Sequence, residues 1–212
     1  MVRKTNSCSN PPTDGRPRAD RRERRALATR QTILRAAAGV FRDRGFAATG
    51  MREIARAADL SPGNLYYYFT SKADILYFCQ DHSIGRMLAA ARTPAGRRRG
   101  SEARLRQVIR DHLLCTLDEL DGAAAHTEVD ALPPVLRRRI VAKRDRYERA
   151  VRRLVAEGMR RRTFVKGDPA LVTRAILGAL NWTSKWYRPG GRLPPAEVAE
   201  AFADYLVRGL KR

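Results

Sequence analysis

Apolar residues recur at helical spacing through most of the chain. From about Ala26 onward they fall three or four residues apart, as on the buried face of an amphipathic helix. No segment shows convincing period-two alternation of the kind that predicts a strand. The predicted helices are Arg24–Arg44, Gly50–Ala57, Pro62–Tyr68, Lys72–Arg92, Ser101–Leu120, a short one within Asp121–Leu132, Val135–Arg161, Asp168–Tyr187 and Ala196–Leu210. The pattern predicts an all-α fold.

Two of the predicted helices are short and are joined by a tight turn. Thr49 is the expected cap of the first, and Asp59 lies in the turn. Ser61 is the expected cap of the second, with Pro62 in its first turn, where a missing N–H has no cost. Two short helices with this connection predict a helix-turn-helix.

The segment from Thr49 to Lys72 reads TGMREIARAADLSPGNLYYYFTSK. Together with the preceding helix from Ile33 to Phe46, it resembles the DNA-binding domain of the TetR family of transcriptional regulators. The family usually has Gly in the turn where this chain has Asp59, and Asp tolerates the left-handed backbone that the turn needs. The family often has His where this chain has Tyr68.

The chain divides into three parts, of which the first is predicted from its polar, proline-broken composition and the other two from the resemblance. Residues 1–22 form a disordered basic arm, residues 23–70 the DNA-binding domain, and residues 71–212 a helical domain for effector binding and dimerisation. The closing segment ALNWTSKWYRPGG is similar to that of TetR-family repressors of lipid and steroid catabolism, some of which respond to acyl-CoA thioesters. The arm either adds a minor-groove contact or is a solvated tail.

The residue types around the second short helix are suited to DNA. Small residues at a helix N-terminus let free N–H groups approach a phosphate, an amide can read a base edge, and hydroxyls and cations can reach phosphates. The candidate DNA contacts are Thr49, Arg52, Ser61, Pro62, Gly63, Asn64, Tyr66, Tyr67 and Lys72.

Net charge adds a second reason to expect a polyanionic partner. The chain has 43 Lys+Arg and 22 Asp+Glu, a formal net charge of +21. Residues 1–75 hold 15 basic and 7 acidic residues, and residues 76–212 hold 28 and 15. The larger share of the excess therefore lies outside the helix-turn-helix. Solvated helix faces in a GC-rich genome are one explanation, and an anionic effector such as an acyl-CoA is the other.

The C-terminal region offers candidates for an effector site and a dimer interface. Polar or aromatic residues on otherwise apolar faces are the candidate ligand contacts, with ordinary core or interface packing as the rival interpretation. These are His112, Thr116, Tyr147, Asn181, Trp182, Lys185 and Trp186. The resemblance implies that the last two helices pair with those of a second copy. The candidate interface residues, with packing inside one subunit as the rival, are Leu177, Leu180, Val198, Phe202 and Tyr205.

Other function classes lack their signatures. Three widely spaced cysteines favour a reducing cytoplasm, and the chain has neither a secretory signal nor a transmembrane run, so we expect no membrane partner. The three histidines lack metal-binding spacing, and no nucleotide loop or GxSxG motif is present, so we expect no metal, no cofactor and no enzymatic activity. The prediction is a dimeric, ligand-responsive repressor that binds a palindromic operator. The alternatives are a sequence-independent basic nucleic-acid-binding protein, an activator on the same scaffold, and a membrane-surface or phospho-ligand binding module in which the helix-turn-helix is vestigial.

Overall fold

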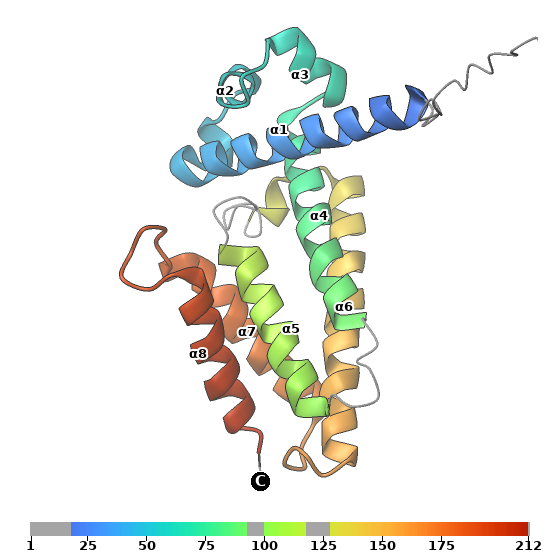
Figure 1. Ribbon diagram of the computed structural model, residues 1–212, viewed down its shortest axis with the longest axis vertical. Helices are drawn as coiled ribbons and strands as arrows, with labels where there is room; N and C mark the ends of the chain where they lie inside the picture. The colour runs from blue at the N-terminus through green and yellow to red at the C-terminus, as the bar shows by residue number, and fades with distance from the viewer. Residues whose placement is uncertain (1–17, 93–99, 118–127, 212) are drawn as a thin grey trace, which may run out of the picture.

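The computed structural model describes residues 18–92, 100–117 and 128–211. Within these ranges the chain forms α-helices and one short 3₁₀ helix, arranged as a small unit across one end of a longer helical bundle (Figure 1). The elements are α1 Arg18–Ala48, α2 Met51–Ala57, α3 Pro62–Tyr68, α4 Lys72–Arg92, α5 Ser101–Leu117, η2 Val129–Ala131, α6 Pro134–Arg160, α7 Pro169–Trp186 and α8 Pro195–Arg208. The described residues contain no strand, only an isolated bridge between Phe164 and Lys211. The all-α prediction is confirmed.

The main differences from the predicted helix limits lie near the N-terminus and around residue 120. Helix α1 begins at Arg18, inside the segment predicted to be a disordered arm, and residues 1–17 lie outside the described residues. Regular helix ends where predicted, at Gly45, whose φ of 77° is a left-handed value that glycine adopts without strain. Of the short helix predicted within Asp121–Leu132, residues 121–127 lie outside the described part, and Val129–Ala131 forms a 3₁₀ turn.

Helix α4 belongs to both parts of the molecule. Its first turn contacts the end of α1, and the rest runs through the bundle beside α5 and α6 (Figure 1). The core is continuous across this junction, from Ile33, Phe41 and Leu65 in the small unit to Ile84 and Leu113 in the bundle, all of which are fully buried. A movement of α4 in the bundle therefore reaches the small unit through packed side chains.

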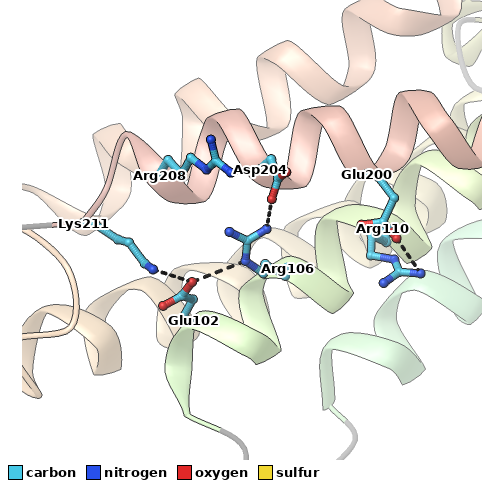
Figure 2. A network of polar contacts seen from close by, with 7 residues as sticks. All are labelled: Glu102, Arg106, Arg110, Glu200, Asp204, Arg208 and Lys211. Carbon is cyan, nitrogen blue, oxygen red and sulfur yellow. Dashed lines mark hydrogen bonds and ion pairs between the residues drawn. The ribbon is translucent and has the colours of Figure 1, made fainter.

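Ion pairs connect α5 to the last helix and the C-terminal residues (Figure 2). Glu102 lies 2.8 Å from Nζ of Lys211 and 3.4 Å from Nε of Arg106, and Arg106 also pairs with Asp204. The hydrogen bond from Lys211 lowers the pKa of Glu102, assisted by Arg106 and opposed by partial burial. The hydrogen bond from Arg106 likewise lowers the pKa of Asp204.

We expect this network to make the bundle acid-sensitive. A carboxylate whose pKa is lowered in the folded protein stabilises it above the ordinary pKa, and that contribution is lost as the pH falls through the lowered value. The free energy of unfolding should therefore decline as the pH falls below about 4. A Glu102→Gln/Asp204→Asn double variant should have a flatter profile in denaturant titrations across this range. Glu23→Gln, on exposed α1, is the control and should keep the wild-type slope; identical slopes in all three proteins would contradict the expectation.

Candidate nucleic-acid interface and effector cavity

The turn between α2 and α3 is built as the sequence predicts. Asp59 has a φ of 55°, the left-handed conformation that Asp tolerates, and the N–H of Leu60 donates to the carbonyl of Ala55 at 2.9 Å. Ser61 caps α3, with its Oγ accepting from the N–H of Asn64 at 3.2 Å. Backbone geometry and capping together hold α3 at a fixed angle to α2.

Helix α3 has a buried side and an exposed side. Leu65 is fully buried, and Phe69 lies in the same core immediately after the helix. The residues on the other side are open to solvent, with Tyr66 and Tyr67 exposed by 53% and 83%. The exposed face consists of Ser61, Pro62, Gly63, Asn64, Tyr66 and Tyr67, and Arg52 of α2 is also exposed. The structure thus gathers seven of the nine predicted DNA contacts on the exposed surface of α2 and α3.

Thr49 is not the cap of α2. That position is Gly50, whose N–H donates to Oε2 of Glu53 at 2.8 Å. Thr49 is only 3% exposed, and its hydroxyl donates to the carbonyl of Gly45 at 2.8 Å. The hydroxyl closes the end of α1, so the predicted cap role of Thr49 is wrong, and its phosphate contact stays a prediction. A Glu three residues after Gly50 was the signal for the true cap.

Lys72 also differs from its predicted role. Its Nζ donates to the carbonyls of Phe46, Ala47 and Thr49, at 2.9, 3.0 and 3.0 Å. The ammonium also lies 4.6 Å from the centroid of the Phe46 ring. All three N–H donors of the ammonium are therefore used on the C-terminal end of α1, where carbonyls and helix dipole both favour a cation. The structure makes Lys72 an internal connection between α1 and α4, and its phosphate contact stays a prediction.

A cavity of about 320 Å³ lies between α4, α5, α6 and α7. It brings together four of the seven predicted ligand contacts: His112, Thr116, Tyr147 and Asn181. Sequence reasoning missed the remaining lining residues, which are Ile84, Met87, Arg144, Asp145, Glu148, Leu177 and Ser184. Spacing carried part of this signal, since Arg144 and Glu148 lie within one turn of Tyr147 on α6.

The most buried polar contact of the cavity joins α5 to α6. Nδ1 of His112 lies 3.0 Å from the hydroxyl of Tyr147, and both side chains are buried. Burial raises the pKa of the Tyr147 hydroxyl far above its ordinary value, so the hydroxyl keeps its proton. A hydroxyl that donates to Nδ1 leaves the imidazole hydrogen on Nε2. Burial also lowers the pKa of Arg144 from its ordinary value.

Trp182, Lys185 and Trp186, also predicted as ligand contacts, do not line this cavity. All three are exposed on α7, with Trp182 exposed by 65%, because they lie on the side of the helix away from Leu180 and Thr183. The ring of Trp186 stacks on that of Phe202 from α8, with centroids 6.3 Å apart.

The predicted interface residues divide into two groups. Leu180 and Val198 are buried inside the subunit, and Leu177 lines the cavity, so packing within one chain, the rival interpretation, accounts for the placement of these three. Phe202 is half-buried, and Tyr205 is 78% exposed. With Leu171, Trp182 and Trp186, Tyr205 leaves large apolar side chains in water on α7 and α8.

Metal and membrane sites are the two other kinds of site that bear on function. Among the described residues, no cluster of three or more His, Cys, Asp or Glu side chains is placed to hold a metal ion. No helix in the same ranges is long and apolar enough to cross a membrane.

Comparison with known families decides the identity of this architecture. The profile for bacterial regulatory proteins of the tetR family matches residues 33–77, which include α2 and α3. The profile for the tetracyclin repressor-like C-terminal domain matches residues 98–210, more than half of the chain. The chain belongs to the TetR family. These two matches confirm the family predicted from the sequence. Members of this family are DNA-binding regulators.

Individual TetR relatives align over most of the chain. The transcriptional repressor KstR2 of Mycolicibacterium smegmatis is 28% identical over 189 residues, which are 85% of this chain and 90% of that protein. The crystal structure of PfmR from Thermus thermophilus has a TM-score of 0.73 at 31% identity and covers 85% of this chain and 99% of that one. AibR, crystallised with isovaleryl coenzyme A and operator DNA, shares the fold, with a TM-score of 0.71 at 24% identity over 86% of this chain and 98% of its own.

Replacing Lys72 in this TetR protein distinguishes an internal connection from a phosphate contact. Lys72→Met removes three charge-assisted hydrogen bonds and should lower the free energy of unfolding by about 2 kcal/mol, measured by denaturant titration. The slope of log K for DNA against log salt should stay at the wild-type value. A phosphate contact predicts the opposite pair of results: unchanged stability, and a slope smaller by about 0.9.

Proposed function

We propose that this protein is a ligand-responsive transcriptional repressor that binds a palindromic operator as a homodimer. The observation that carries the proposal is the α3 surface, where exposed polar residues are held in place by a buried anchor. Tyr66 and Tyr67 face water while Leu65, between Asn64 and Tyr66, is fully buried. A helix anchored on one side and exposed on the other is the form that major-groove readers take. The KstR2 relative is a repressor, which supports the sign of regulation.

Within the groove, the exposed residues of α3 divide into two roles. Pro62 and Gly63 have little bulk, and a Cβ added at Gly63 would meet no atom within 4 Å, so the start of α3 can approach DNA closely. Asn64 is placed to read a base edge, most favourably adenine. The hydroxyls of Tyr66 and Tyr67 reach outward toward phosphates, as does the exposed Arg52.

Dimerisation follows from the apolar surface of α7 and α8. Trp182, Trp186 and Tyr205 are large side chains that a monomer leaves in water at a cost. A two-fold axis through this surface buries them against their copies. It also sets two α3 helices side by side, and an operator with half-sites about one helical turn apart fits such a pair.

The effector is a small molecule held in the cavity between α4 and α7. Its volume lies near the lower end of the range for ligand pockets. The positive charge of Arg144 is offset in the cavity lining by the carboxylates of Asp145 and Glu148, so the cavity is not strongly basic. It suits a polar group of the ligand that both accepts and donates hydrogen bonds. An acyl-CoA would place its acyl group inside and its phosphates outside. The AibR complex supports this option only by showing that the fold accommodates such a ligand together with operator DNA.

Ligand binding is coupled to DNA through α4. Ile84 and Met87 of α4 line the cavity, and Lys72 at the start of the same helix is bonded to the end of α1. A ligand that displaces the cavity end of α4 thereby turns the helix-turn-helix, and the two α3 helices of the dimer leave their operator spacing.

A DNA-binding regulator acts in the compartment of the chromosome, so we place the protein in the cytoplasm and assign it no catalytic step. The second candidate is an activator on the same scaffold. A sequence-independent binder is not favoured, because the ordered and exposed α3 face is more specific than charge attraction requires.

Asn64→Ala tests base readout. The protein should lose about 1–3 kcal/mol of preference for a selected operator over random duplex, because one amide contact with a base edge is removed. Electrophoretic mobility shift at fixed salt measures both affinities. Tyr67→Phe is the matched variant and should weaken both duplexes equally, as expected when a phosphate contact is lost. Unchanged discrimination in Asn64→Ala would exclude this amide from readout.

Tyr147→Phe tests the effector cavity. Removing the hydroxyl leaves His112 without that partner, so the thermal shift and the release of operator DNA caused by acyl-CoA thioesters of increasing chain length should both require at least about tenfold more ligand. Affinity for operator without ligand should stay at the wild-type value. Val135→Ala, which is exposed at the start of α6 and lies outside both the cavity and the proposed dimer surface, is the control and should respond as the wild type. An equal response in all three proteins would place the effector elsewhere.

A further inference from the structure

The basic excess outside the helix-turn-helix is concentrated on α6. This helix, Pro134–Arg160, contains ten basic and three acidic residues. Ion pairs between described residues hold Arg137 to Asp130, Lys143 to Asp81 and Arg152 to Glu148, and Arg144 belongs to the cavity. Most of the other basic residues of α6 belong neither to the DNA-binding surface of α3 nor to the cavity, so their role has to be explained separately.

Five of the remaining arginines form one line along the exposed side of α6. They are separated by 7, 3, 4 and 7 residues, a spacing that keeps them within roughly 80° of the helix circumference. All five are exposed, and within the described ranges none lies within 4 Å of an acidic group. We call this set the α6 arginine stripe: Arg139, Arg146, Arg149, Arg153 and Arg160.

The buried side of α6 faces the other way. Ile140, Tyr147, Val151 and Leu154 point into the bundle, so the stripe is turned outward along the whole helix. The acidic residue that lies within the line, Glu157, is already held by Arg104 and Arg161, at 3.2 and 2.9 Å. The stripe therefore has an uncompensated positive field over about 32 Å, close to one turn of duplex DNA.

We infer that the α6 arginine stripe binds a second DNA duplex, separate from the operator held by α3. Between Arg139 and Arg160 the stripe has no large apolar side chain, whereas a helix that lies on a membrane needs an apolar face. Arginine forks suit phosphate oxygens better than lysine does. Duplex DNA, with a regular line of phosphates and no requirement for apolar contact, is the polyanion that fits.

The position of α6 explains why this duplex is a second one. Helix α6 runs lengthwise down the bundle, beside α4 and on the side away from α8 (Figure 1). Its C-terminal end lies at the opposite end of the molecule from α3 (Figure 1). A straight operator seated against α3 does not follow α6. A dimer with its two stripes facing outward would join DNA segments that are distant along the chromosome. The statement that α3 holds an operator rests on the proposed function, whereas the statement that the α6 arginine stripe binds DNA does not.

A capture experiment tests the second duplex. Wild-type protein is bound to an immobilised duplex that it has selected from a random pool, and a labelled random duplex of about three turns is then added. The wild type should retain the labelled duplex at low salt. The triple variant Arg146→Gln/Arg149→Gln/Arg153→Gln should retain at least about tenfold less labelled duplex than the wild type. The slope of log capture against log salt should also be smaller by about 2 to 3. Its operator affinity should stay within about twofold of the wild type.

A control with the same change in charge separates the stripe from net charge. Lys166→Gln/Arg174→Gln/Arg192→Gln removes three exposed cations from outside α6 and should capture like the wild type. Loss of capture in both variants, or in neither, overturns the inference. Wild type that captures no second duplex, or that captures anionic phosphatidylserine vesicles in preference to it, also overturns it. Wild type that selects no sequence from the pool contradicts the proposed repressor function instead, and the stripe is then tested by its salt slope on random duplex.

Discussion

The contact on which both halves of the molecule depend is that between the Lys72 ammonium and the end of α1. The ammonium of Lys72, the first residue of α4, donates to three backbone carbonyls at and just after the end of α1, of which that of Phe46 also accepts from the N–H of Thr49. The same residue therefore ends one helix and starts another. It also fixes the angle at which the small unit meets the bundle. The DNA-binding helices and the effector cavity can influence each other only if the junction between them stays folded when α4 moves. The Lys72 ammonium, with all three of its N–H donors bonded to backbone carbonyls, keeps that junction rigid.

Much of the fold was predictable because its local and tertiary preferences agree. Apolar spacing gave the helices, Gly45 ended α1, and Ser61 with Pro62 began α3, since each of these signals acts within one turn of the residue that carries it. The internal hydrogen bonds of two predicted DNA contacts were not predictable, for a different reason. Thr49 and Lys72 have the right chemistry to contact DNA, but their partners are carbonyls 4 and 23 to 26 residues away. No spacing rule reports whether a donor has already been used inside the protein.

The candidate ligand residues show that spacing along a helix also does not tell which face of that helix lines the cavity. His112, Thr116, Tyr147 and Asn181 converge on one cavity although they come from three helices, because polar groups on mostly apolar faces are kept only where a partner or a ligand satisfies them. Trp182 and Trp186 share a face with each other but not with the cavity. Periodicity places residues on a common side of a helix, and only tertiary packing decides whether that side faces the interior, a second subunit or water.

The net charge of +21 is distributed differently over three parts of the molecule: α3, the cavity and α6. At α3, recognition is carried mainly by uncharged groups, and the basic residue nearest to them in the motif is used internally. In the cavity, Arg144 is offset by two carboxylates. On α6, five arginines stand in line without acidic partners in the described ranges. Mutual repulsion along such a helix opposes folding, so the stripe persists at a cost to stability that an anionic partner removes. A composition bias would scatter arginines over all exposed faces equally, whereas the uncompensated ones on α6 share one face and avoid the side that packs.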